Sequence, residues 1–179
     1  MSNEFKPIAR EALKEIKPYT PGKPIEEVKR ELGISDVIKM ASNENPLGPS
    51  PKALKEMAEA IKDVHLYPDG NCFRLKQAIS DCKGVKDTEI IVGNGSDEVI
   101  KLLAEAFINE GDHAIMADPS FSEYDFAVTL MGGKMKKVRL DQDFRHDLDA
   151  MLGAIDEKTR IIFVCNPNNP TGTIVTKEE

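Results

Sequence analysis

The sequence has few of the residues that hold metals or form disulfides, and it lacks a long apolar run. Its 179 residues include three cysteines and three histidines. The cysteines form no C-x-x-C pair and the histidines are scattered, so we expect no metal site. An odd number of cysteines without a signal peptide is typical of a reducing compartment, so we expect a cytoplasmic protein. No apolar run is long enough to span a membrane.

The charge balance argues against partners that carry negative charge. Lysine and arginine number 24 against 31 acidic residues, which gives a net charge of −7. This excess of negative charge disfavours nucleic acids and anionic membrane surfaces as main partners. The length allows one domain with a real core, and the chain shows no internal repeat.

The first 40 residues predict an N-terminal arm followed by a short helix. Residues 1–24 are polar and interrupted by prolines, so we expect this arm to pack on another element or on a partner subunit. Pro24 can open a helix that runs to Leu32, and Gly33 can end it.

Residues 41–179 predict the front part of one large domain. Apolar residues at helical spacing predict helices at 51–61 and 73–82. Short apolar runs then alternate with helices and predict strands at 90–92, 114–117, 134–140 and 160–165. This alternation is typical of an α/β fold, with a mostly parallel sheet and helices on both faces.

The most informative stretch is the turn at residues 166–172, Asn-Pro-Asn-Asn-Pro-Thr-Gly, which directly follows a predicted buried strand. Ligands of open α/β sheets bind beyond the carboxyl ends of the strands. Prolines on either side restrict the backbone around Asn169, so its amide is a candidate ligand-binding group. The alternative is that asparagine and proline simply end the strand, as they do in many loops.

A second candidate site lies between a predicted strand and a helix, at Gly95, Ser96 and Asp97. Unpaired N–H groups and the helix dipole could bind a phosphate there. The acidic residues Asp97 and Glu98 would suit an ordinary helix start equally well. Glu98 stands where the dinucleotide fingerprint requires glycine, and no G-K-[ST] follows, so two common phosphate motifs are excluded.

Two aromatic residues and one polar loop complete the candidates. Phe121, after another strand, could stack on a planar ring or belong to the core. Tyr67, on a Pro-Asp-Gly turn, could offer its phenol to a charged ligand or be an ordinary surface residue. The loop at 42–49 could contribute amides such as that of Asn45 to a site, or be only a surface loop.

The last four residues, Thr176 to Glu179, match the capping box T-x-x-E, which typically begins a helix. We therefore expect the chain to be the front part of a longer protein.

Taken together and in this order, the motifs resemble the front of the class I/II aminotransferases of PLP fold type I, in particular the subgroup acting on histidinol phosphate. The motifs are Asn43–Pro46, Tyr67–Gly70, Gly93–Glu98, Asp118–Phe121 and Asn166–Gly172. The resemblance runs from about Pro18 to Glu179. It implies transfer of an amino group between histidinol phosphate and 2-oxoglutarate in histidine biosynthesis, with pyridoxal 5′-phosphate (PLP) as cofactor and a homodimer as the assembly.

The resemblance also implies a role for each candidate residue. The N–H groups of Ser96 and Asp97, beside Gly95, would hold the cofactor phosphate. Phe121 would stack on the pyridine ring, and Asn169 would hydrogen-bond the 3-oxygen of the ring. The remaining two roles are less direct: Tyr67 would reach the phosphate in the neighbouring subunit, and Asn45 would contact substrate.

The resemblance further implies that the reactive group is absent from these residues. No lysine here stands in the Ser-Lys context of the family's Schiff-base lysine, so no catalytic residue is assigned and we expect the chain alone to be inactive. Three alternatives stay open: a threonine-phosphate decarboxylase, an aromatic aminotransferase, and a non-catalytic fragment that binds a phosphate-bearing ligand.

Overall fold

The computed structural model describes residues 9–16 and 22–179. Their contacts form two compact units: residues 20–90 make one, and residues 1–19 together with 91–179 make the other. The predicted domain boundary near residue 40 stays a prediction.

The unit of residues 20–90 is helical in its described part. Its elements are α1 (Ile25–Leu32), α2 (Pro51–Ala60), η2 (Ile61–Asp63), α3 (Phe73–Lys83) and η3 (Asp87–Glu89). All three predicted helices are confirmed, and their ends follow from local chemistry. Pro51 opens α2, while Gly33 and Gly84 end α1 and α3 in the left-handed conformation, with φ of 65° and 69°.

The strand predicted at residues 90–92 is wrong. Ile90 has the extended dihedrals of a strand, φ −114° and ψ 123°, but this segment joins no ladder among the described residues. A strand is defined by pairing with a neighbour, and the apolar pattern alone supplies no neighbour.

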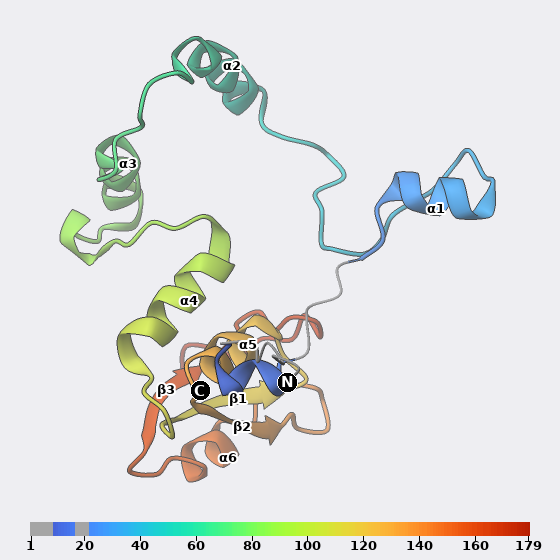
Figure 1. Ribbon diagram of the computed structural model, residues 1–179. Coiled ribbons are helices and arrows are strands. Elements are labelled where there is room, and N and C mark those ends of the chain that lie inside the picture. Colours follow the sequence, from blue (N-terminus) through green and yellow to red (C-terminus); the bar gives the residue numbers. More distant parts are fainter. Residues whose placement is uncertain (1–8, 17–21) are drawn as a thin grey trace, which may run out of the picture. The chain divides into compact units, whose positions relative to one another are not determined.

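The second unit contains a three-stranded parallel sheet (Figure 1). Its elements are η1 (Glu11–Lys14), α4 (Gly95–Phe107), β1 (His113–Asp118), α5 (Glu123–Leu130), β2 (Lys134–Arg139), α6 (Leu148–Gly153) and β3 (Thr159–Phe163). The strand order is β2-β1-β3, and β1 pairs in parallel with both neighbours. The predicted α/β class with a parallel sheet is therefore confirmed.

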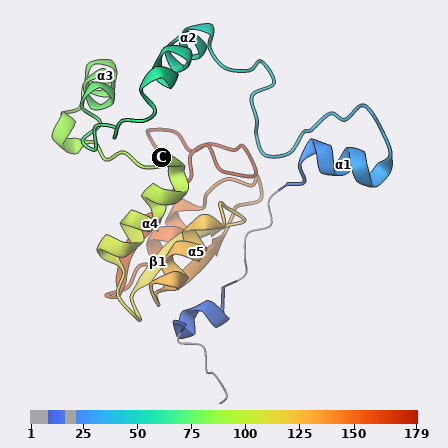
Figure 2. The ribbon, with the colours of Figure 1, turned by 45° about the horizontal axis from the view of Figure 1, so that its top comes forward.

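Helices cover both faces of the sheet because successive residues of β1 point in opposite directions. Ala114 and Met116 belong to a core cluster with Ala104 of α4 and Val128 of α5. On the other face, Ile115 packs in a smaller cluster with α6. Figure 2 shows α4 and α5 over the same face of β1.

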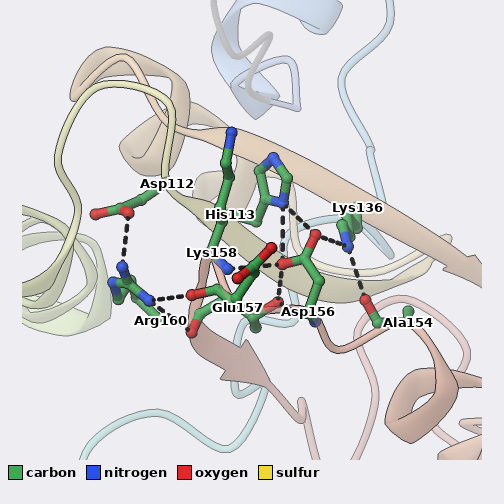
Figure 3. Close-up of polar contacts among 9 residues, drawn as sticks. Asp112, His113, Lys136, Ala154, Asp156, Glu157, Lys158 and Arg160 are labelled. Atoms are coloured by element: carbon green, nitrogen blue, oxygen red, sulfur yellow. Dashed lines mark hydrogen bonds and ion pairs between the residues drawn. The ribbon is translucent and has the colours of Figure 1, made fainter.

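A polar network ties the strands together at the amino edge of the sheet (Figure 3). The Asp156 carboxylate accepts a hydrogen bond from Lys136 Nζ of β2 at 2.7 Å and contacts His113 Nδ1 of β1 at 2.9 Å. It also accepts a hydrogen bond from Thr159 Oγ1 at the start of β3, at 2.9 Å. The bond from Lys136, followed by those from Thr159 and His113, holds the pKa of Asp156 well below its usual range.

The described part of the N-terminal arm lies against α5 of the same chain. Arg10 Nη1 donates a hydrogen bond to the Leu130 carbonyl, one of the unpaired carbonyls at the end of α5, at 3.0 Å. A contact of the arm with a partner subunit stays a prediction.

Within residues 9–16 and 22–179, no helix combines the length and apolar character needed to cross a bilayer.

Candidate functional site

The candidate site lies at the carboxyl edge of the sheet, where the chain leaves β1 and β3. The segment after β1 carries Phe121, and the segment after β3 carries the 166–172 turn. A side-chain hydrogen bond joins the two segments, from Ser120 Oγ to Asn168 Oδ1 at 2.9 Å. Parallel neighbouring strands thus bring together two motifs that are 48 residues apart.

Asn168 is the buried centre of the turn, with 2% of its surface exposed. Its N–H donates to the Thr173 carbonyl at 2.9 Å, and its carbonyl accepts from the Gly172 N–H at 2.7 Å. Its side-chain amide donates to the Pro119 carbonyl at 3.2 Å and to Thr171 Oγ1 at 2.8 Å. A buried polar group with this many partners fixes the loop around it.

Asn169, the predicted ligand-binding residue, is only partly buried. Its side-chain amide makes no hydrogen bond within the described part of the chain, whereas the adjacent Asn168 amide is fully engaged. The two adjacent asparagines therefore differ in role: Asn168 holds the turn, and Asn169 keeps a free donor and acceptor. Sequence reasoning missed Asn168, because both residues have the same chemistry and only burial separates them.

Phe121 starts a row of three aromatic rings. Its ring meets Tyr124 edge-on, with centroids 5.7 Å apart, and Tyr124 stacks on Phe163 at 4.4 Å. Phe121 is partly buried against the main core cluster, so the core contact expected as one alternative is present. Burial, and then the neighbouring Cys165 thiol, raise the pKa of the Tyr124 phenol, which stays protonated at neutral pH.

The predicted phosphate site lies in the first turn of α4. This helix begins at Gly95, which has φ of 78°. Gly95, Ser96 and Asp97 therefore form its first turn, and they do not lie between a strand and the helix as predicted. The Asn94 side chain does not cap the helix. The Gly95 N–H donates to the Gly93 carbonyl at 3.0 Å, whereas the N–H groups of Ser96 and Asp97 have no partner within a helix and can bind an anion.

Acidic side chains surround this helix start. Glu123, at the start of α5, is 8% exposed. Burial and the nearby Asp97 carboxylate raise the pKa of Glu123, while Lys101 opposes this shift. An anion at α4 would therefore depend on directed N–H groups and the helix dipole, because the neighbouring carboxylates repel it. The effect of Asp97 on Glu123 also shows that the start of α4 lies near the start of α5, the helix that follows Phe121.

His146 is a second residue that the sequence did not single out. It is 5% exposed, and its Nε2 lies 2.8 Å from the Cys165 carbonyl at the end of β3. A carbonyl can only accept, so Nε2 carries the proton and donates. Nδ1 is buried without a partner among the described residues. His146 thus orients the residue that precedes the 166–172 turn.

Tyr67 and Asn45 belong to the unit of residues 20–90. The Tyr67 side chain is fully exposed. Both ends of the Asn45 amide are used within its own turn: Oδ1 accepts from the Leu47 N–H at 3.0 Å, and Nδ2 donates to the Gly48 carbonyl at 3.2 Å. The proposed ligand contacts of these two residues stay predictions.

Comparison with known proteins identifies the class to which this fold and site belong. The model of the family "Aminotransferase class I and II" matches residues 35–179. The chain therefore belongs to the class I and II aminotransferases.

Within this family, the relatives found include histidinol-phosphate aminotransferases. The enzyme of Moorella thermoacetica is 61% identical over 169 residues, which are 94% of this chain and 44% of the relative. That of Caldicellulosiruptor saccharolyticus is 54% identical over 170 residues, 95% of this chain and 47% of the relative. The chain thus spans less than half the length of the curated relatives it matches.

Solved structures agree on the fold. The histidinol-phosphate aminotransferase of Sinorhizobium meliloti, crystallised in complex with pyridoxal-5′-phosphate, superimposes with a TM-score of 0.81 at 23% identity, covering 94% of this chain and 45% of that one. The enzyme of Clostridium acetobutylicum gives a TM-score of 0.67 at 34% identity over 76% of this chain and 40% of that one. The described fold is therefore part of the aminotransferase fold.

Proposed function

We propose that this chain is the front part of a PLP-dependent aminotransferase that transfers an amino group between histidinol phosphate and 2-oxoglutarate in histidine biosynthesis. The observation that supports this best is the 61% identity with a histidinol-phosphate aminotransferase over 94% of the chain. The site also supports it, because it offers three groups that suit a planar phosphorylated ring. These groups are the first turn of α4, Phe121 and the free amide of Asn169.

The residues present fit this cofactor. N–H groups of Ser96 and Asp97 would hold its phosphate, Phe121 would pack against its ring, and the Asn169 amide would donate to its 3-oxygen. When bound, PLP supplies an electron-withdrawing ring that stabilises negative charge on the substrate carbon. The chain's own part is to orient the ring and exclude water from one of its sides.

The chain by itself lacks a candidate for the covalent step. None of its lysines follows a serine, so we propose that these 179 residues do not turn over substrate. In the longer protein we propose a cytoplasmic homodimer, in which Tyr67 reaches the cofactor phosphate of the neighbouring subunit and Asn45 contacts substrate.

A spectroscopic experiment tests the covalent claim. The purified chain is mixed with PLP, and its visible spectrum is recorded before and after borohydride. We expect no reducible band that maps to a single lysine. Specific labelling of one lysine would show that the chain holds the nucleophile after all.

The substrate is tested on the longest protein encoded around this sequence. We expect amino transfer from histidinol phosphate to 2-oxoglutarate to exceed both amino transfer from aromatic amino acids and decarboxylation of threonine phosphate. A higher kcat/KM with either competing substrate would replace the proposed one.

A further inference from the structure

We propose that Asn168 is a positioning residue that holds Asn169 and Phe121 in register, so that Phe121 reaches the face of one ring and Asn169 reaches an oxygen at its edge; this rests on the proposed function. Asn168 itself is 2% exposed and cannot touch a ligand directly. Its side chain is instead the direct link between the segments that carry the two proposed contacts.

The orientation of the Asn168 amide follows from its neighbours. The Pro119 carbonyl can only accept, so Nδ2 must face it, at 3.2 Å. This leaves Oδ1 to accept from Ser120 Oγ at 2.9 Å. Both ends of the amide therefore hold the segment that leads into Phe121.

The same amide also starts a hydrogen-bonded chain on the other side. Thr173 Oγ1 donates its only hydrogen to the Phe144 carbonyl at 2.6 Å. Thr171 must therefore donate to Thr173 Oγ1 at 2.8 Å, and its own oxygen accepts from Asn168 Nδ2 at 2.8 Å. Every donor in this chain has one acceptor, which fixes a single arrangement of the turn.

This arrangement has a consequence for Asn169. The backbone of Asn168 is bonded to Gly172 and Thr173, which closes the turn around Asn169. With residue 168 held inward, the next side chain points elsewhere and stays free. A change at Asn168 should therefore disturb both the turn and the Phe121 segment, although the two are far apart in sequence.

The matched variants are Asn168→Asp and Asn166→Asp. Each keeps the side-chain volume and removes an Nδ2 donor. In Asn168→Asp, an oxygen replaces the donor and faces the Pro119 carbonyl, which also accepts. Asn166 is exposed, and its Nδ2 bonds only within the same loop, to the Val175 carbonyl at 2.9 Å. Ser120→Ala is the milder variant, because it removes a single link between the segments.

The first readout is amide hydrogen exchange in the 179-residue chain, which needs no cofactor. Two amides serve as reporters: the Tyr124 N–H, bonded to the Phe121 carbonyl, and the Gly172 N–H, bonded to the Asn168 carbonyl. We expect Asn168→Asp to raise exchange about tenfold at both, Ser120→Ala to raise it less, and Asn166→Asp to change neither. Unchanged exchange at Tyr124 in Asn168→Asp would overturn the coupling.

The second readout is the binding of pyridoxamine 5′-phosphate to the longest protein encoded around this sequence. This probe cannot form a Schiff base with lysine, so its affinity and absorption spectrum report the non-covalent contacts alone. We expect about tenfold weaker binding and a shifted absorption band in Asn168→Asp, with the Asn166→Asp protein like the wild type. Equal binding by the two variants would overturn the positioning role. Absence of binding by the wild type would instead overturn the proposed function, and the exchange experiment would still decide whether Asn168 couples the segments.

Discussion

The helices α2 and α4 both place apolar residues at helical spacing, but they differ in what covers them. In α4, Ile100 is 6% and Ala104 is 1% exposed, because the helix packs in the core cluster of the sheet. In α2, Leu54 and Met57 are about half exposed, at 50% and 52%. The same contrast holds for the described residues as a whole, since every buried residue lies within 91–179 and none within 22–90. The apolar pattern and the caps therefore predict where a helix lies, whereas its burial depends on a partner surface.

Among variants that test the difference between residues 91–179 and 22–90, we expect Ile115→Ala to have the largest effect on stability. Ile115 is fully buried on β1, so its truncation should lower the free energy of unfolding by about 2–5 kcal/mol. Urea denaturation followed by circular dichroism measures this difference. The matched variant in the other stretch is Leu54→Ala, where we expect at most about 0.5 kcal/mol. Equal losses would mean that α2 also contributes to the cooperative core.

Alanine substitutions at two glycines, one within the core and one outside it, test the same contrast in packing. A Cβ at Gly133 would lie 2.5 Å from Ile108 Cγ2 and 2.9 Å from Val128 Cγ1, so Gly133→Ala should destabilise by about 1–3 kcal/mol. At Gly70 nothing lies within 4 Å of such a Cβ. Gly70→Ala should therefore leave the thermal midpoint unchanged. A neutral Gly133→Ala would show that this part of the core is loosely packed.

Much of the fold could be predicted from sequence because its signals are local. Gly33 and Gly84 end helices, and Asp147 caps α6 by accepting from the Ala150 N–H at 2.9 Å. The box at Thr176 and Glu179 also forms its two reciprocal hydrogen bonds. The strand at residues 90–92 failed because pairing is not a local property.

The proposed ligand-binding residues of the candidate site could be predicted from sequence motifs, but the residues that hold them in place could not. Asn169 and Phe121 each follow a predicted strand, so their positions at the carboxyl edge followed from the prediction of a mostly parallel sheet. Asn168 and His146 act through bonds to Ser120 and Cys165, which are 48 and 19 residues away. Such contacts depend on the complete arrangement of strands, and no spacing rule reveals them.

The third prediction concerns acid and the amino-edge network. The pKa of Asp156 is lowered in the folded state, so its carboxylate stabilises the fold above the ordinary aspartate pKa of about 3.9, and this contribution is lost as pH falls toward the lowered value. Asp156→Asn should lower the thermal midpoint at pH 7, and the gap to wild type should narrow below about pH 4. Thermal melts at a series of pH values measure the gap. Asp143→Asn is the control, because this exposed carboxylate makes no hydrogen bond among the described residues. If the difference in thermal midpoint between Asp156→Asn and wild type did not change with pH, the charge of the Asp156 carboxylate would not be its cause.

We expect the smallest effect on stability from a variant within residues 22–90, where no residue is buried. Gly84 has φ of 69° and donates its N–H to the Ser80 carbonyl at 2.8 Å, which ends α3. An alanine there strains the backbone by about 1–2 kcal/mol. Because α3 has no buried residue, this cost should unwind the last turn of the helix and leave the unfolding of the sheet untouched.

Amide exchange separates these two outcomes for Gly84→Ala. Faster exchange at the end of α3, with unchanged exchange in β1 and an unchanged denaturation midpoint, would show that residues 22–90 open independently of the core. A matching loss of protection in β1 would mean that the two stretches unfold together. The difference in burial between α2 and α4 would then not be a difference in cooperativity.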